Sequence, residues 1–125
     1  MSSTEDLLNL SLKLLDAIDD HDWATYEQLC DPGLTAFEPE AKGHRISGMP
    51  FHKFYFDSQP SGRRQSSIVA PEVKIIGDAA IVTYIRLTQV YSGDKKHSTK
   101  SCEETRVWEK QNGEWKHIHF HRSVV

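Results

Sequence analysis

The chain has 125 residues, of which 38% are apolar and 26% charged, so we expect residues 1–125 to form one domain around a single core. Its formal net charge of −3 gives no reason to expect a nucleic-acid or anionic-membrane partner, and no apolar run approaches the ~20 residues of a membrane-spanning helix. Cys30 and Cys102 match no metal-binding or redox spacing. We predict that both are reduced and, because no signal peptide is visible, that the protein is cytoplasmic.

The first quarter of the sequence predicts two helices. Hydroxyl and acidic residues in Ser3–Asp6 precede an apolar stripe at helical spacing, which predicts a helix of about 16 residues ending in Asp19-Asp20-His21. Asp22 is placed to cap a second helix, Trp23–Leu29. Asp31-Pro32-Gly33 should stop it, because proline keeps the preceding residue out of the helical region and glycine accepts a left-handed backbone.

Shorter elements and then long strands follow. We expect a short strand at Leu34–Glu38 and one or two helical turns at Phe51–Phe56. A strand at about Gln65–Ile76, bent or interrupted at Pro71, should lead through a Gly77-Asp78 turn. The longest strand is expected at Ala79–Tyr91, and loops are expected at Ser58–Gly62 and Ser92–Asp94.

The predicted strand Ala79–Tyr91 has apolar side chains on both faces. Alternation places Val82, Tyr84, Arg86 and Val90 on one face and Ile81, Ile85, Leu87 and Tyr91 on the other. A helix can cover only one of these faces, so the second should contact another layer or another subunit. This pattern indicates oligomerisation. The order of elements predicts an α+β fold in which a bent antiparallel sheet wraps the N-terminal helix.

A β-hairpin is predicted in the last quarter, Ser101–Ser123. Asn112-Gly113 suits the two central positions of a type I′ turn, and residues typical of strands flank it on both sides. Because an isolated hairpin is marginally stable, this ribbon should form one wall of the sheet.

Several strings in the chain closely resemble the association (hub) domain of calcium/calmodulin-dependent protein kinase II. They lie at Leu29–Gly43, Pro50–Phe56, Tyr84–Gln89, Glu103–Trp108 and His119–Ser123. The chain departs from the family pattern around Ser58–Arg64, Gly77–Ala80 and Gln111–Gly113. Nothing in it resembles the kinase domain, the autoinhibitory helix or the calmodulin-binding segment, so we expect the hub alone.

The resemblance implies a fold and an assembly. The fold would be a nuclear-transport-factor-2-like (cystatin-like) cone, with a long N-terminal helix wrapped by a strongly curved antiparallel sheet. Subunits would pair, and the pairs would form two stacked rings, a dodecamer or tetradecamer, as a non-catalytic scaffold without cofactors. Such a hub would bring kinase domains together for trans-autophosphorylation, because tethering raises their effective concentration.

The resemblance also implies a deep cavity. Arg86, Arg106 and Arg122 occupy the family's cavity positions, together with Tyr26, Glu38 and His52. Clustered guanidinium groups need carboxylate partners or a bound anion, and Glu38 and Glu104 are the candidate internal partners. We expect Glu38 to lie next to Arg86 and to be held ionised. The cavity would accept a small carboxylate or an acidic side chain of a docked segment, such as the kinase's own regulatory segment or linker; ordinary salt bridges are the alternative.

The hairpin turn conflicts with a shared cavity. A regular ladder from Asn112-Gly113 pairs Arg106 with His119 and places Arg106 and Arg122 on opposite faces. Both arginines can reach one cavity only if an extra residue shifts the alternation. We therefore predict a β-bulge in this hairpin.

Two other readings remain open. His117, His119 and His121 would share one face of a regular strand, about 7 Å apart, which is a zinc pattern; hydrogen-bonded structural histidines are the alternative, and we expect no metal.

The cone fold also houses isomerases and dehydratases. An enzyme of that kind, or a small-molecule-binding protein, is the alternative function, and it should exist as a monomer or dimer rather than as a ring.

Overall fold

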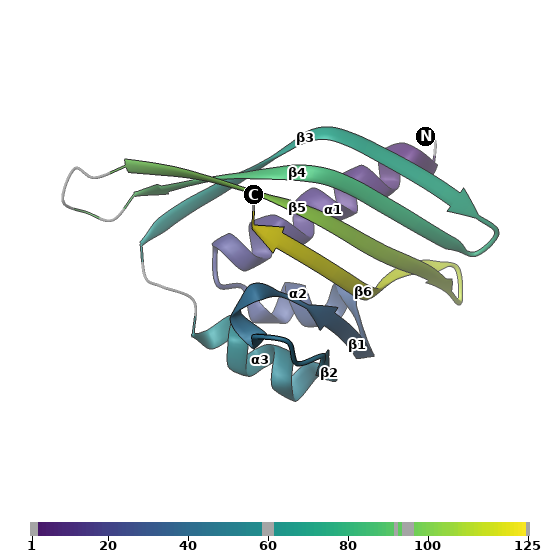
Figure 1. Ribbon diagram of the computed structural model, residues 1–125. Coiled ribbons are helices and arrows are strands. Elements are labelled where there is room, and N and C mark those ends of the chain that lie inside the picture. Colours follow the sequence, from purple (N-terminus) through teal and green to yellow (C-terminus); the bar gives the residue numbers. More distant parts are fainter. Residues whose placement is uncertain (1–2, 59–61, 92, 94–96, 125) are drawn as a thin grey trace.

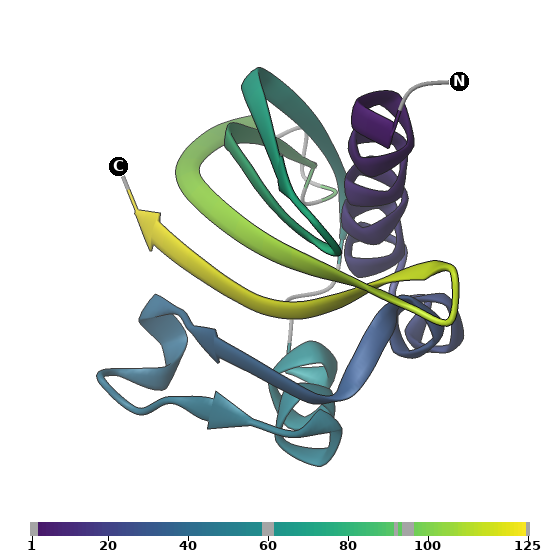
Figure 2. The ribbon, with the colours of Figure 1, turned by 90° about the vertical axis from the view of Figure 1, so that its right-hand side faces the viewer.

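A curved six-stranded sheet organises the protein in the computed structural model, which describes residues 3–58, 62–91, 93 and 97–124 (Figure 1). The strand order is β2-β1-β6-β5-β4-β3. Neighbouring strands are antiparallel except β1 and β6, which are parallel. Figure 2 shows the sheet curving, with α1 upright beside it and β1, β2 and α3 grouped below. The predicted α+β fold is confirmed.

Three α-helices form where the sequence predicts them. Helix α1 (Ser3–Asp19) buries Leu7, Leu14 and Leu15 and packs chiefly on β3. Helix α2 (Trp23–Leu29) is capped by Asp22, whose Oδ1 accepts from the Thr25 backbone N–H at 3.2 Å. Helix α3 (Met49–Asp57) has Pro50 in its first turn, where the missing N–H costs nothing. Among the described residues no helix is long and apolar enough to cross a membrane.

Strand β1 (Cys30–Phe37) starts earlier than predicted. Helix α2 ends where expected, but the chain goes directly into the strand through Asp31-Pro32-Gly33. The predicted left-handed backbone at Gly33 is wrong: the Asp31 Oδ2 accepts from its N–H at 2.8 Å and holds a local turn without a positive φ. A short 3-10 turn, η1 (Pro39–Ala41), and the two-residue strand β2 (Ile46–Ser47) follow; neither is predicted from the sequence.

Strands β3 (Arg63–Ile76) and β4 (Ala79–Tyr91) form the expected long pair. Their register shifts between Val69 and Glu72, next to Pro71, and Ala70 adopts a φ of 52°. Gly77 turns the chain at a φ of 60°, in the left-handed region that favours glycine. Parts of both predicted loops, residues 59–61 of Ser58–Gly62 and residues 92 and 94 of Ser92–Asp94, lie outside the described residues.

The predicted hairpin is formed by β5 (His97–Gln111) and β6 (Glu114–Val124). Asn112 and Gly113 have φ values of 51° and 82°, as a type I′ turn requires. Trp108 pairs with His117, but Val107 pairs with His119, so Ile118 is an extra residue in β6. The predicted bulge is therefore confirmed. It pairs Arg106 with Phe120 and turns both toward the interior.

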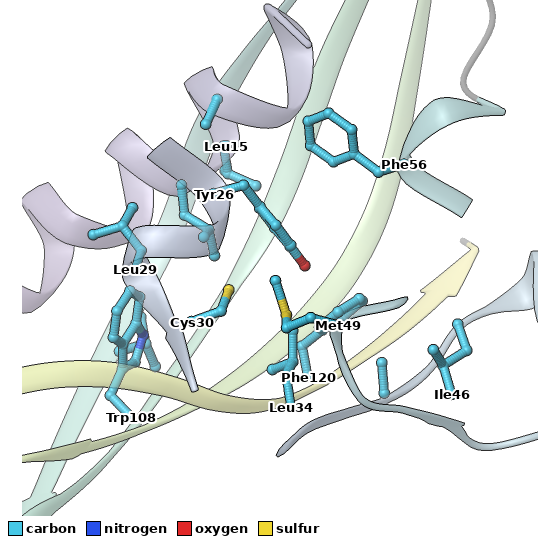
Figure 3. Packing of buried hydrophobic residues seen from close by; sticks show 14 of the residues in the cluster. Leu15, Tyr26, Leu29, Cys30, Leu34, Ile46, Met49, Phe56, Trp108 and Phe120 are labelled. Carbon is cyan, nitrogen blue, oxygen red and sulfur yellow. The ribbon is translucent and has the colours of Figure 1, made fainter. Parts of the chain in front are cut away.

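The core lies between the concave face of the sheet and the helices (Figure 3). In this core Tyr26 packs against Phe56, with ring centroids 5.3 Å apart. Trp108 is fully buried. The other fully buried apolar side chains among the described residues are Leu7, Leu14, Leu15, Leu34, Ala36, Ala80 and Val82.

The two faces of β4 differ in burial. Val82, Tyr84 and Arg86 are buried on the concave face, while Ile85 on the outer face is 37% exposed and Tyr91 is 38% exposed. The helices thus cover one face and leave an apolar side chain open to solvent on the other, as the alternation predicts.

Candidate functional site

A small pocket opens on the concave face between α2, α3 and the sheet. Its volume is about 50 Å³. It brings together all six residues singled out from the sequence: Tyr26, Glu38, His52, Arg86, Arg106 and Arg122. Four further polar or aromatic side chains that the sequence reasoning did not place there complete the lining with Ile18: Tyr55, Phe56, Arg64 and Phe120. Four guanidinium groups thus face one small space.

Glu104 is the anionic centre behind this pocket. Its Oε1 accepts from the Tyr84 hydroxyl at 2.5 Å and from Arg106 Nη2 at 3.1 Å, and its Oε2 accepts from Arg86 Nη1 at 3.2 Å. All of these side chains are buried. Burial alone would raise the pKa of Glu104, but the charges of Arg106 and Arg86 outweigh it and lower the pKa to about 2. Glu104, the second candidate partner, is therefore the main one.

Asp19 is a second buried partner that the sequence reasoning missed. Its Oδ1 accepts from Arg86 Nη2 at 3.0 Å and from Arg64 Nη2 at 3.3 Å. In the sequence it belongs to a polar helix end, which normally indicates exposure to solvent. Only the packing of the end of α1 against β3 and β4 shows that this carboxylate is 5% exposed and faces two arginines.

Glu38 pairs with a different arginine from the one predicted. Arg122 Nη2 donates to Glu38 Oε2 at 3.3 Å, and the same Nη2 also donates to Glu40 Oε2. Burial raises the pKa of Glu38, and Arg122 only partly offsets this. The prediction that Arg86 lies beside Glu38 and holds it ionised is wrong, because Arg86 is turned toward Glu104 and Asp19.

The three alternating histidines do not share a face. The bulge at Ile118 turns His117 into the core, whereas the rings of His119 and His121 pack on the exposed Phe37. Within the described part of the chain no three His, Cys, Asp or Glu side chains are arranged to hold a metal ion. The one-face arrangement on which the zinc alternative rests is therefore wrong.

His117 extends the buried network away from the pocket. Arg106 Nη1 lies 3.3 Å from His117 Nε2, and because arginine can only donate, this nitrogen is the acceptor of a neutral imidazole. Its Nδ1 lies 3.6 Å from the Cys30 Sγ. Burial and the nearby Arg106 lower the pKa of His117 well below its ordinary value. Burial also raises the pKa of the Cys30 thiol to about 12, so Cys30 is a neutral core residue.

His52 lines the pocket and carries an unused hydrogen-bond acceptor. Its Nδ1 donates to the Gly48 carbonyl at 2.7 Å, which leaves the lone pair of the neutral ring on Nε2. Nε2 is buried and has no hydrogen-bond partner among the described residues. Burial lowers the pKa of His52, which favours this neutral form.

The buried Glu104 should make stability pH-dependent. The pKa of Glu104 in the folded protein, about 2, lies below the ordinary value of 4.5. Its ionised carboxylate therefore contributes fully to the free energy of unfolding above pH 4.5, and this contribution is lost as the pH falls toward 2. The contribution amounts to about 3 kcal/mol. Urea unfolding at fixed protomer concentration should show that the difference in unfolding free energy between wild type and Glu104→Gln becomes smaller from pH 5 to pH 2.5. A gap that does not change with pH would contradict this.

Comparison with known protein families gives a match over nearly the whole chain. The family described as the calcium/calmodulin dependent protein kinase II association domain matches residues 3–125. The chain belongs to this family. The resemblance of the sequence strings is thereby confirmed, and hub-domain membership supports a role in oligomerisation through self-association.

Relatives of this association domain agree in sequence and structure. It is 44% identical over 123 residues to the calcium/calmodulin-dependent protein kinase type II subunit delta of Oryctolagus cuniculus, covering 95% of this chain and 23% of that protein. The chain thus spans about a quarter of that relative's length. The hub homology domain of Chlamydomonas reinhardtii superposes with a TM-score of 0.91 at 41% identity, covering 100% of this chain and 99% of that one.

More distant structures share only the fold of this association domain. A nuclear-transport-factor-2-like protein from Cytophaga hutchinsonii superposes with a TM-score of 0.83 at 21% identity over all of both chains. The predicted nuclear-transport-factor-2-like fold is confirmed. At this identity the likeness carries no information about function.

Proposed function

We propose that this association domain assembles into a stacked double ring, a dodecamer or tetradecamer, that gathers kinase domains for trans-autophosphorylation. The observation that carries the proposal is the match over the full chain to hub domains in both sequence and structure. Tethered kinase domains meet at a high effective concentration, so phosphorylation of a neighbour becomes an intramolecular event. Such an assembly would act in the cytoplasm.

The exposed apolar side chains support assembly. Ile85 on the outer face of β4 is 37% exposed, and Phe51 and Phe54, three residues apart on α3, are 66% and 67% exposed. Large apolar side chains gathered on open faces are typical of contact surfaces between proteins. In a ring these faces would lie against neighbouring subunits.

We propose that the domain itself is not catalytic. The buried carboxylate of Glu104 is fixed by two guanidinium groups and a tyrosine hydroxyl, and its lowered pKa is far from the value that suits a general base near neutral pH. An isomerase or dehydratase needs a base that can exchange a proton with a substrate. This arrangement favours a binding site over a reaction centre.

The pocket is proposed to bind a carboxylate. Arg64, Arg86, Arg106 and Arg122 line it, and the carboxylates that they contact are those of Asp19, Glu38, Glu40 and Glu104. Among the described residues that line the pocket, Glu38 is the one carboxylate beside four guanidinium groups. A small carboxylate, or an acidic side chain of the kinase's own regulatory segment or linker, would complement this charge.

Native mass spectrometry at micromolar protomer concentration tests the assembly. Wild type should give one species of twelve or fourteen subunits. Ile85→Asp should shift it to smaller species, because it places a charge on the apolar outer face. Leu12→Asp, which changes a 39% exposed leucine on α1, should keep the wild-type mass. A wild-type dimer that does not grow with concentration would refute the ring and favour the small-molecule alternative.

A further inference from the structure

Arg122 at the edge of the pocket already holds two carboxylates. Glu38 Oε2 and Glu40 Oε2 both accept from its Nη2, the first at 3.3 Å. One positive charge is therefore matched by two negative charges at the same nitrogen. A third carboxylate, brought by a ligand, would add like-charge repulsion at close range unless one of the two residents moved away.

The two resident carboxylates differ in how easily they can leave. The Glu38 side chain is 11% exposed and lines the pocket, whereas that of Glu40 is 46% exposed and lies outside the lining. A displaced Glu40 would return to water at little cost. A displaced Glu38 would be a largely desolvated carboxylate without its partner, which is expensive. Glu40 is therefore the group that should leave.

The backbone around Glu40 allows this exchange without a change of fold. Glu40 lies in η1, where the Ala41 N–H donates to the Glu38 carbonyl at 3.1 Å and the Lys42 N–H donates to the Pro39 carbonyl at 3.1 Å. Ala41 is 3% exposed and anchors the turn in the core. Rotation of the Glu40 side chain alone can therefore release Arg122.

We propose that Glu40 is a built-in competitor for the pocket: it occupies Arg122 in the empty domain and is displaced by an incoming carboxylate. The inference rests on the proposed binding of carboxylates by the pocket. Glu40 then lowers the affinity for every carboxylate that reaches Arg122, and a ligand must contact the inner arginines as well in order to bind tightly. In this way Glu40 selects against simple monocarboxylates.

Saturation-transfer NMR with acetate as the probe tests this in the assembled domain. Sodium acetate replaces sodium chloride at constant ionic strength, so that screening does not change. Relative to wild type, Glu40→Gln should lower the dissociation constant for acetate about threefold to fivefold, the range expected for loss of a half-exposed ion pair. Arg122→Ala should abolish measurable binding. Glu103→Gln is the matched control, because it removes an exposed carboxylate from the opposite face of β5, beside Ser123.

Each outcome separates the two proposals. If Glu40→Gln binds acetate more tightly than wild type while Glu103→Gln binds it with the wild-type dissociation constant, the role of Glu40 as a competitor is supported. Equal tightening by both variants would show a general charge effect and overturn it. Acetate binding that needs Arg122 but is the same in Glu40→Gln would overturn the competitor and leave the carboxylate pocket standing. No acetate binding by wild type or by Glu40→Gln would overturn both, while the ring assembly would still be judged by its mass.

Discussion

Glu104→Ala is expected to lower the free energy of unfolding by about 3–5 kcal/mol, the typical cost of removing one partner from a buried ion pair. The substitution removes one carboxylate contact from each of the buried Arg86 and Arg106, and the Tyr84 hydroxyl loses its acceptor. Arg86 keeps its contact with Asp19, whereas Arg106 loses its ion-pair partner. Desolvated guanidinium groups without a carboxylate are costly. The effect should therefore exceed that of any single surface substitution.

Urea unfolding at neutral pH and fixed protomer concentration measures this loss, because assembly contributes to apparent stability. Glu103→Ala is the matched control. The neighbouring residue on β5 is exposed on the opposite face, so its replacement should change stability by less than about 0.5 kcal/mol. A loss below about 1 kcal/mol for Glu104→Ala would mean that the network is not a source of stability.

Trp108→Ala should also cost about 3–5 kcal/mol, because it removes a fully buried indole and leaves a cavity. Trp108 lies on β5 against the His117 ring, with centroids 5.2 Å apart, at the start of the bulged segment. Collapse of the surrounding sheet is limited by the strand ladders on both sides. The site can therefore recover little of the lost packing.

Two further tryptophan variants in the same urea experiment test whether the loss of stability is due to the burial of Trp108. Trp115→Ala truncates the same side chain where it is only partly buried beside Lys110, and should cost about 1 kcal/mol. Trp108→Phe should cost clearly less than Trp108→Ala, because the Trp108 Nε1 has no hydrogen-bond partner in the described part of the structure. Equal losses for Trp108→Ala and Trp115→Ala would refute the burial argument.

Local patterns in the sequence predict most of the elements. The helical spacing of Leu7, Leu14 and Leu15, the cap at Asp22 and the turn at Asn112-Gly113 act over only a few residues, so their consequences can be derived without knowing the fold. The bulge in the final hairpin is derived differently. It follows from a conflict between strict alternation and the shared cavity that the family resemblance implies for Arg106 and Arg122.

The early start of β1 shows where local patterns fail. The residues Asp31-Pro32-Gly33 have a turn composition, and they lie in the irregular part of β1, between the pairs Cys30–His117 and Thr35–His119. The parallel pairing with β6 on either side of them spans more than eighty residues of sequence. The turn residues thus form a bulge-like irregularity inside the strand rather than ending it, because pairing with a distant strand resumes after them. The short elements η1 and β2 have no periodicity that a sequence pattern could reveal.

Whole strings of residues in the sequence identify the family, and through that resemblance they name six of the residues that line the pocket. The pairing of the charges is known only from the folded chain: Glu104 and Asp19 with Arg86, and Glu38 and Glu40 with Arg122. The reason is physical. A carboxylate finds its partner through space, within about 4 Å, and the partners here come from α1, β4, β5, β6 and the η1 segment, whose relative positions are set by packing of the whole core rather than by any local spacing.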